Sequence, residues 1–426
     1  MPQDIEVDGI KVVASEATLF AGGSTAQGWA AHLECWGPPP DSDLLAALDS
    51  CGLRGRGGAA FPTVRKWRAV AAAAGSSGQP TRVVVNGNEG EPASAKDRAL
   101  LLLRPHLVID GAILAARTIG ATAITVVIER HSVAAATSLR EALAERTDLG
   151  QLSVRVLDGP DHYVAGESSA VASLVDGGDA KPDFARRWGE PTASARTLTH
   201  NVETLAQVGV LARVGPQSFA KSTPSSFPGT FLFTLSGAVA APPTVVEAQA
   251  DVPLESLIAA AGGSLMESAA LLVGGYAGTW IATSQLPPGA TPASLTADGV
   301  PVGCGVIGVL PRSRCGLQET ASIAEYLARE SAQQCGPCER GLPAIAGALR
   351  SLADARRGTT ALRNIERWTG LVQGRGACHH PDGVVTLVRS ALRAFAEDVE
   401  QHERGRRCGR HRDPLFPLPP TATAWR

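Results

Sequence analysis

Residues 81–92 read TRVVVNGNEGEP, and this stretch decides the fold. Three β-branched valines in succession form a continuous apolar run, which is typical of a strand buried on both faces of a parallel sheet. The run then breaks into a polar, glycine-containing loop. In open α/β sheets, ligands bind beyond the carboxyl ends of the strands. The stretch therefore predicts a parallel sheet with a functional edge at residues 86–92.

Helical and extended patterns alternate on the C-terminal side of this strand. Helices are expected at 106–121 and 134–146, and strands at 123–129 and 152–158. Such alternation indicates an α/β layer with a mostly parallel sheet.

The composition and hydrophobic pattern of the chain change twice after this layer. Short apolar runs rich in Gly and Pro follow residue 228 and fit a small α+β module of the β-grasp kind, and apolar stripes at helical spacing from residue 319 predict a bundle of about four helices. We therefore expect five parts: an irregular segment (1–40), an α/β domain (41–228), a β-grasp domain (229–318), a helical bundle (319–405) and a mobile Pro-rich tail (406–426).

Composition narrows the function classes. A formal net charge of -2 over 426 residues gives no electrostatic case for binding nucleic acid or an anionic membrane. No uncharged apolar run reaches the ~18 residues that span a bilayer, and the N-terminus lacks a signal-peptide pattern, so a cytoplasmic protein is expected. In a reducing compartment eight cysteines are not a disulfide framework. Five look isolated and are interpreted as ordinary thiols: Cys35, Cys51, Cys304, Cys315 and Cys408.

Two loops carry candidate ligand contacts. The stretch GLRGRGGAAFPT (52–63) places four glycines before a helix, where backbone N–H groups and the helix N-terminus favour phosphate. The loop after the first strand offers polar side chains to a heterocycle or a ribityl chain. A plain turn remains an open alternative for either loop alone.

A cysteine motif lies in the helical region. Cys335 and Cys338 stand two residues apart in SAQQCGPCER (331–340), as metal ligands from one tight turn do, and Cys378 follows in GRGACHHPDG. An iron–sulfur site, a zinc site and buried thiols all remain open from the residues alone.

The order of six motifs carries a family resemblance. GLRGRGGAAFPTVRKW, NGNEGEPASAKDR, PHLVIDG, YVAGESSA, HNVETLA and the cysteine set occur in this order over roughly residues 42–405. Together they resemble the flavin-bearing, NADH-oxidising 51-kDa (F) subunit of respiratory complex I and its relatives in soluble NAD-linked hydrogenases and formate dehydrogenases. The resemblance implies a Rossmann-like FMN/NADH domain, a β-grasp domain and a four-helix bundle with a [4Fe–4S] cluster.

The resemblance also implies roles for particular residues. Those on the FMN and NADH side are the phosphate-binding backbone of Gly55, Arg56, Gly57 and Gly58, with Lys66 nearby, and the side chains of Phe61, Asn86, Asn88, Glu89, Lys181 and Asn201. Phe61 would stack on the adenine of NADH. Glu91 and Glu167 match acids on the nicotinamide side and are the candidate catalytic residues.

Departures from the family pattern affect both cofactors. The loop usually reads N-x-D-E-S-E-P, so Asn88 stands for an Asp and Gly90 for a Ser, and Ser168 replaces a second acid. One negative charge fewer beside the flavin should make it easier to reduce. Lys181 is a looser match, since the segment after it is shorter than in the family.

Ala332 stands where the first cluster cysteine should be, which leaves Cys335, Cys338 and Cys378. One interpretation is a cluster whose fourth iron takes His379, His380 or water, or which lacks that iron as a [3Fe–4S] centre. A non-thiolate ligand would raise its potential. A second is a Cys₃His zinc site. A third is a decayed site with packed thiols.

We therefore expect an FMN-dependent NADH dehydrogenase subunit. It would pass electrons through the cluster to a ferredoxin-like or thioredoxin-fold iron–sulfur partner, or to a membrane reductase complex. Two alternatives stay open: a flavin or cluster carrier or structural subunit without NADH oxidation, and a zinc-stapled binding module.

Overall fold

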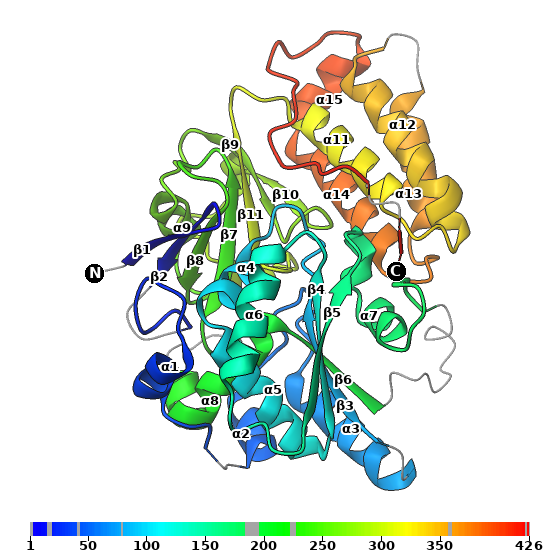
Figure 1. Ribbon diagram of the computed structural model, residues 1–426. Helices are drawn as coiled ribbons and strands as arrows, with labels where there is room; N and C mark the ends of the chain where they lie inside the picture. The colour runs from blue at the N-terminus through cyan, green and yellow to red at the C-terminus, as the bar shows by residue number, and fades with distance from the viewer. Residues whose placement is uncertain are drawn as a thin grey trace.

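The computed structural model describes residues 3–14, 19–40, 43–77, 80–183, 196–221, 227–356, 360–421 and 424–425. Two sheets and a helical region make up the molecule (Figure 1). In this view the helical region lies above the four-stranded sheet and to the right of the seven-stranded sheet, and the first and last described residues lie on opposite sides of the molecule.

A four-stranded parallel sheet confirms the predicted α/β layer. Its order is β5 (Ser153–Gly159), β4 (Ala123–Glu129), β3 (Arg82–Gly87) and β6 (Thr197–Asn201), and every neighbouring pair is parallel. The helices of this layer are α2 (Leu44–Cys51), α3 (Thr63–Ser77), α4 (Lys96–Leu103), α5 (Pro105–Ile119), α6 (Val133–Glu145), α7 (Ser168–Val175) and α8 (Val202–Lys221).

Packing between α5 and α8 depends on one glycine. The apolar residues of α5 are buried almost without interruption. A Cβ at Gly111 would lie 1.9 Å from the backbone oxygen of Leu205, so the two helices approach closely only because that position has no side chain. The helix ends at Gly120, whose φ of 67° is the left-handed conformation that glycine adopts readily.

The second sheet is mixed and has seven strands. Its order is β1 (Gln3–Val7), β2 (Ile10–Ala14), β8 (Thr244–Ala248), β7 (Phe231–Gly237), β11 (Val306–Pro311), β9 (Ser268–Val273) and β10 (Thr279–Ala282). Strand β11 runs parallel to β7 and antiparallel to β9. The short helices α9 (Leu254–Ala260) and α10 (Pro292–Ala297) accompany these strands.

The expectation that residues 1–40 are irregular was wrong. They contribute the hairpin β1–β2 and the helix α1 (Trp29–Trp36), and β2 pairs in parallel with β8. The signal was present in the sequence, because Asp8 and Gly9 both have positive φ (47° and 73°) between two strands, and an Asp-Gly pair favours a two-residue hairpin turn.

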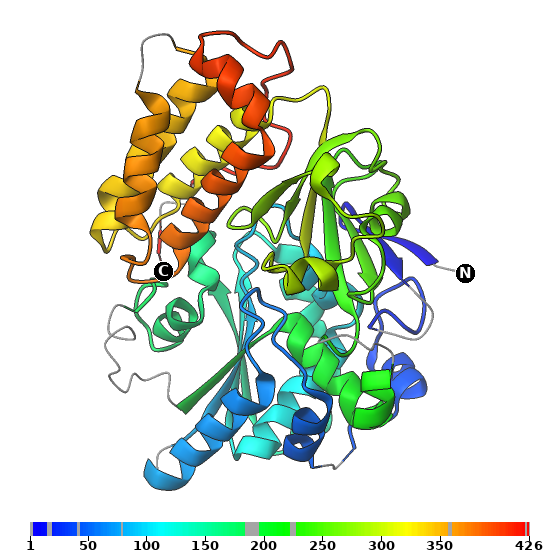
Figure 2. The same cartoon turned by 180° about the vertical axis from the view of Figure 1, so that it is seen from behind.

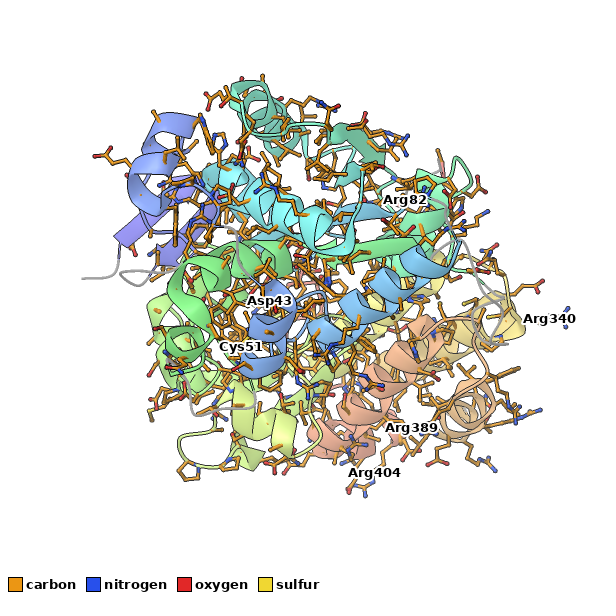
Figure 3. The ribbon with its side chains drawn as sticks, turned by 90° about the horizontal axis from the view of Figure 1, so that it is seen from below. Asp43, Cys51, Arg82, Arg340, Arg389 and Arg404 are labelled. Atoms are coloured by element: carbon orange, nitrogen blue, oxygen red, sulfur yellow. The ribbon has the colours of Figure 1, made fainter. Side chains whose placement is uncertain are left out.

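The C-terminal region is helical, as predicted. It consists of α11 (Gly316–Arg329), a one-turn π-type segment (Pro337–Gly341), α12 (Leu342–Ala353), α13 (Ala361–Val372), α14 (His380–Ala394) and α15 (Ala396–Glu403). Figure 2 shows these helices side by side from behind. In the view from below, Arg340, Arg389 and Arg404 mark this region, whereas Asp43 caps the N-terminus of α2 and Cys51 is its last residue (Figure 3).

The tail was expected to be mobile, but its described part is packed. Phe416 is 2% exposed, and the carboxylate of Glu319 accepts hydrogen bonds from the backbone N–H groups of Leu415 and Phe416. Further on, the Trp425 ring stacks on His162 with centroids 3.7 Å apart. The apolar Phe416 supplied an anchor that the prolines around it concealed.

No single helix of the described residues has both the length and the apolar character to cross a membrane. The pair α4 and α5 passes that test of length and composition only jointly, with a bend of 97° between the two helices.

Candidate functional site

Two asparagines meet where two neighbouring strands of the parallel sheet end. Asn86 on β3 and Asn201 on β6 are register partners. The Asn86 amide donates to the Gly166 backbone oxygen at 2.8 Å, and the Asn201 amide donates to Asp97 at 2.5 Å. This carboxyl edge is the position predicted from the valine run.

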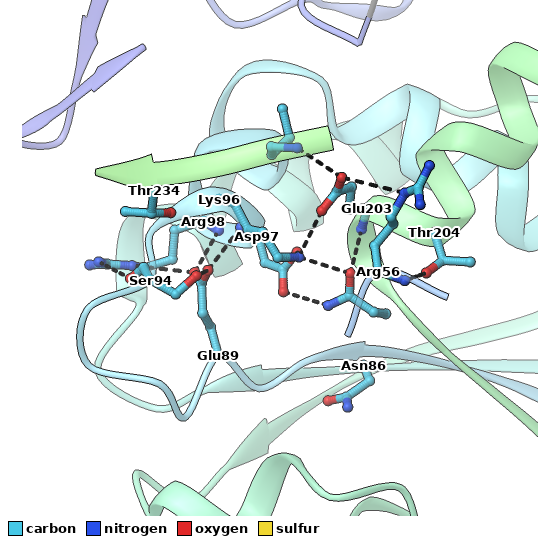
Figure 4. Close-up of polar contacts among 12 residues, drawn as sticks. Arg56, Asn86, Glu89, Ser94, Lys96, Asp97, Arg98, Glu203, Thr204 and Thr234 are labelled. Carbon is cyan, nitrogen blue, oxygen red and sulfur yellow. Dashed lines mark hydrogen bonds and ion pairs between the residues drawn. The ribbon is translucent and has the colours of Figure 1, made fainter. Parts of the chain in front are cut away.

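A buried polar network lies beside this edge, at the start of α4 (Figure 4). The Lys96 ammonium donates to Asp97 at 2.8 Å and to Asn201 at 3.0 Å, and it pairs with Glu203 at 3.0 Å. Lys96 is only 2% exposed. Burial alone would lower the pKa of Lys96, but Asp97 and Glu203 raise it instead, so the ammonium is held charged.

Arg56 closes the far side of the network. Its guanidinium stacks on the Phe231 ring at 3.6 Å, donates to the Pro228 backbone oxygen at 2.6 Å and lies 3.9 Å from Glu203. Burial lowers the pKa of Arg56 to about 10, against the opposing effect of Glu203. The Arg56 backbone N–H, expected at the phosphate, donates to the Thr204 hydroxyl at 2.9 Å.

In this structure the Glu89 carboxylate forms hydrogen bonds with the protein itself. Its carboxylate accepts from the backbone N–H groups of Asp97 and Arg98, both at 3.1 Å, and from the Ser94 hydroxyl at 2.5 Å. These bonds satisfy the otherwise unpaired N-terminus of α4. Burial, followed by the charge of Asp97, raises the pKa of Glu89. Its expected flavin contact therefore competes with a helix-capping role.

Two residues of the KDR stretch at 96–98, Lys96 and Asp97, are buried (2% and 4% exposed). Neither these two nor Glu203 was singled out from the sequence. The signal available was their position: Lys96 and Asp97 follow the loop after β3, and Glu203 lies two residues after the end of β6.

The glycine-rich loop lies against this edge. A Cβ at Gly57 would meet the Asn201 Cβ at 3.2 Å, and Gly58 has φ of 108° and lies close to the backbone of Cys304. Phe61, 48% exposed, leaves its ring open to solvent. Such close glycine backbone beside two asparagines and an open aromatic ring fits a flat, phosphate-bearing ligand such as a flavin nucleotide.

Glu91 links the loop to the second sheet. Its carboxylate accepts from the Tyr276 backbone N–H at 2.8 Å and from the Tyr163 hydroxyl at 3.2 Å. A Cβ at Gly275 would come within 2.5 Å of Glu91, so the turn after β9 approaches this acid closely. Burial raises the pKa of Glu91 to about 7, although the Tyr276 N–H opposes the shift. A carboxyl group of this kind can hold or release a proton near neutral pH.

Three other predicted residues have protein partners. Lys66 donates to the Thr199 backbone oxygen at 2.6 Å. Glu167 accepts from the backbone N–H groups of Ser169 and Ala170, at 2.7 and 3.2 Å, and so caps α7. Lys181 pairs with Asp179 at 3.1 Å, and its ammonium lies 5.2 Å from the centre of the Trp425 ring.

The three clustered cysteines come together between the π-type segment and the start of α14. Burial raises the pKa of Cys338, and neighbouring Cys335 and Cys378 add to the shift. Burial also raises the pKa of Cys378, with Glu167 and Cys335 adding to it. Clustered thiols are the donor set that iron–sulfur clusters take.

The two histidines after Cys378 differ sharply. His379 is fully exposed and lies 3.8 Å from Asp382. His380 is buried, and its Nε2 bonds to the Leu327 backbone oxygen at 2.8 Å, while its Nδ1 has no hydrogen-bond partner. Nδ1 is thus a buried nitrogen without a hydrogen-bond partner, two residues after Cys378 in the sequence. The His380 ring also lies 5.5 Å from that of Tyr163.

Two of the cysteines interpreted as isolated are not. Cys315, His402 and Cys408 converge, with their ligand atoms all within 4.8 Å of one another. Cys315 and Cys408 are 93 positions apart in the sequence, so no local spacing motif predicted the group.

The fold, the polar edge and the cysteine cluster together define a complex I-like oxidoreductase subunit. The model of the Nuo51 FMN-binding domain matches residues 48–210, and that of the NADH-ubiquinone oxidoreductase-F iron-sulfur binding region matches residues 318–402. The NADH-quinone oxidoreductase F subunit 2 of Rhizobium meliloti (strain 1021) is 31% identical over 411 residues, covering 93% of this chain and 96% of the relative. The corresponding F subunit of Streptomyces coelicolor is 28% identical, covering 91% and 87%. The chain belongs to the family of NADH-quinone oxidoreductase F subunits, as a divergent member.

A solved structure agrees with this assignment. The NAD+-reducing [NiFe]-hydrogenase in the air-oxidized state superimposes with a TM-score of 0.74 at 26% identity over 88% of this chain. This chain spans 64% of the length of the hydrogenase chain.

Proposed function

We propose that this chain is an electron-input subunit that oxidises NADH with FMN and transfers electrons to an iron–sulfur cluster. The observation that supports this proposal most directly is the position of Tyr163. Its hydroxyl donates to Glu91 at the sheet edge, and its ring lies 5.5 Å from that of His380, two residues after Cys378. The proposed flavin and cluster sites are therefore neighbours.

When bound, FMN supplies hydride acceptance from NADH and release of electrons one at a time. The chain's own residues hold and shape its site. Gly55, Gly57 and Gly58 let the backbone approach the phosphate, Asn86 and Asn201 offer amides at the strand ends, and Phe61 offers an open face for the adenine. Lys96, kept charged by its acidic neighbours, places a fixed positive charge beside the edge and stabilises negative charge there.

Glu91 and Glu167 are proposed to face the nicotinamide side. Glu91 can hold a proton at its carboxyl group near neutral pH because it is buried. Glu167 caps the N-terminus of α7. To contact NADH as well, its carboxylate must either keep its hydrogen bonds to α7 or give them up when NADH binds. Lys66, Asn88, Glu89 and Lys181 belong to the same proposal as supporting contacts.

Cys335, Cys338 and Cys378 are proposed to ligate a [4Fe–4S] or [3Fe–4S] cluster. A single zinc ion needs donor atoms within a few ångströms of one another. Within the described residues, the group that meets this spacing is Cys315, His402 and Cys408. We therefore favour an iron–sulfur cluster over a zinc ion as the group that Cys335, Cys338 and Cys378 bind.

The unit boundaries stay a proposal: 41–228 for FMN and NADH, 229–318 as a β-grasp domain and 319–405 as the cluster-bearing bundle. The strand order β8-β7-β11-β9-β10, with a parallel pair at its centre, supports the β-grasp assignment. We propose a cytoplasmic location and a ferredoxin-like or thioredoxin-fold iron–sulfur partner, as expected for a protein that hands on single electrons.

The test is the visible spectrum and metal content of protein purified without oxygen, before and after NADH is added. A flavin band that NADH bleaches, with about three or four iron atoms per chain, supports the proposal. Bleaching by dithionite but not by NADH would leave a carrier without NADH oxidation. A colourless protein would overturn the assignment.

A further inference from the structure

A second cysteine–histidine group lies in the helical region, apart from Cys335, Cys338 and Cys378. Cys315 directly precedes α11, His402 lies in the last turn of α15, and Cys408 follows in the tail. Their sulfur and nitrogen ligand atoms all lie within 4.8 Å of one another. The start of α11, the end of α15 and the tail that follows α15 thus come together at one point.

The histidine is oriented as a metal ligand would be. His402 is 2% exposed, and its Nδ1 bonds to the Leu352 backbone oxygen at 3.2 Å. A carbonyl can only accept, so Nδ1 carries the proton and Nε2 keeps its electron pair as an acceptor. In this structure Nε2 accepts a hydrogen bond from the Cys408 backbone N–H at 3.2 Å, a bond that a metal ion at Nε2 would replace. Metal-binding histidines are commonly fixed in this way through their second nitrogen.

The backbone around the two cysteines is also fixed. The Cys315 N–H donates to the His411 backbone oxygen at 3.0 Å, and the His411 N–H donates to the Ser313 oxygen at 2.9 Å. The tail therefore runs beside residues 313–315 and holds Cys408 near Cys315. Asp398, 4% exposed and paired with Arg410, is near enough for its charge to act on Cys315 and His402.

We propose that Cys315, His402 and Cys408 bind a structural Zn²⁺ ion, with water or the Asp398 carboxylate in the fourth position. Two thiolates and one imidazole suit zinc, which takes tetrahedral sulfur and nitrogen ligands. Binding releases the two thiol protons to solvent and involves no change of oxidation state. The ion clasps the tail onto the bundle and so fixes residues 408–421, including the buried Phe416.

Zinc and iron should be measured together on the full chain produced in zinc-containing medium. The unmodified protein should hold about one zinc ion per chain, bound by two sulfurs at about 2.3 Å and one imidazole nitrogen at about 2.0 Å in zinc-edge X-ray absorption. Cys315→Ser and Cys408→Ser should lower zinc at least tenfold and leave iron unchanged. The control Cys35→Ser, on an exposed cysteine of α1, should keep the zinc.

Cys338→Ser separates this site from the proposed cluster, since it should lower iron and keep zinc. Zinc below a tenth of an ion per unmodified chain would overturn the proposal. So would zinc that survives Cys408→Ser, or mass spectrometry showing a Cys315–Cys408 disulfide in the purified protein. The X-ray absorption measurement uses the unmodified chain, so misfolding of a variant cannot decide the question.

Discussion

At the scale of single residues, Glu91 has the environment with the clearest chemical consequence. It is a carboxyl group held by the Tyr276 backbone N–H and the Tyr163 hydroxyl, and its titratable neighbours include Cys304, Glu89, Tyr276 and Tyr326. Burial is the largest influence on it and raises its pKa to about 7. The folded protein therefore binds the proton of Glu91 more tightly than the unfolded chain does.

This shift predicts a pH dependence of stability. Because the folded pKa is the higher one, the stabilising contribution is complete below pH 4.5 and is lost as the pH rises to about 7. Glu91→Gln should flatten the decline of the melting temperature over this range. Glu89, Glu129, Glu203 and Glu319 are shifted in the same direction, so part of the decline should remain. The control Glu255→Gln, at an exposed position, should not flatten it; an equal effect of both variants would contradict the prediction.

Asn88 leads to a prediction about the flavin potential. It stands where the family has an Asp, and its amide donates to the Pro160 backbone oxygen at 3.4 Å. In FMN-loaded protein, Asn88→Asp should restore a negative charge and lower the flavin midpoint potential by on the order of 30 mV, measured by anaerobic redox titration. Asn88→Ala loses the same hydrogen bond without gaining a charge. Equal shifts in the two variants would show that charge is not the cause.

His380 and His379 form a matched pair for the cluster. His380 has a buried Nδ1 without a partner, whereas His379 is fully exposed. If Nδ1 occupies the position vacated at Ala332, His380→Ala should change the low-temperature EPR spectrum of the cluster or reduce its iron content, and His379→Ala should do neither. An unchanged spectrum and iron content in His380→Ala would leave water as the fourth ligand or a three-iron centre.

Part of the candidate site could be predicted from single residues. The valine run correctly placed the polar edge, and Asn86 and Asn201 do meet there. What the sequence could not show was competition for side chains. Glu89 and Glu167 turn to helix N-termini, which is a geometric need that appears only when the helices are placed. Cys315 and Cys408 escaped notice because their meeting depends on the path of the tail.

At the scale of elements, the α5–α8 contact gives a sharp test. Gly111→Ala would place a methyl group 1.9 Å from the Leu205 backbone oxygen, and backbone cannot move aside cheaply. We expect a loss of about 1–3 kcal/mol or more in the free energy of unfolding, measured by chemical denaturation.

Gly347→Ala is the matched control. It also lies inside a helix, α12, but is exposed with nothing near its Cβ position. There the change should stabilise by about 0.5–1 kcal/mol, since alanine is the better helix former. Similar losses at both positions would show that helix propensity, not the α8 backbone, controls Gly111.

Elements with strong periodicity were predicted well. The strand expected at 123–129 is confirmed, the strand expected at 152–158 is found at 153–159, and the helices between and before them are confirmed. The hairpin β1–β2 was missed, although its Asp-Gly turn is a local signal. Its partner β8 is not local at all, because residues 11–13 pair with residues 244–246. No window of sequence contains that pairing.

At the scale of the whole molecule, the tail joins the helical bundle to the second sheet. Phe416 packs against Trp280 of β10 with ring centroids 6.1 Å apart, while Glu319 of α11 binds its backbone. Phe416→Ala should cost about 3–5 kcal/mol of the free energy of unfolding, as is typical of a buried Phe, and so lower the melting temperature. It should also speed tryptic cleavage at the arginines of residues 404–412. Pro419→Ala, on an exposed residue, should leave both unchanged. Slow cleavage in Phe416→Ala would show that the tail is held elsewhere.

The hairpin at the N-terminus has a consequence for the order of events during synthesis. Its strands are made before β8, and β2 cannot complete its pairing until β8 has been made about 230 residues later. At roughly 5–20 residues per second, this wait lasts on the order of ten seconds or more. Val13 packs in a core cluster whose other buried members come from residues 227–309, so it stays without those partners during this wait. The growing chain should therefore depend on chaperones early in translation, and high contact order in the second sheet should make its closure a late step of folding.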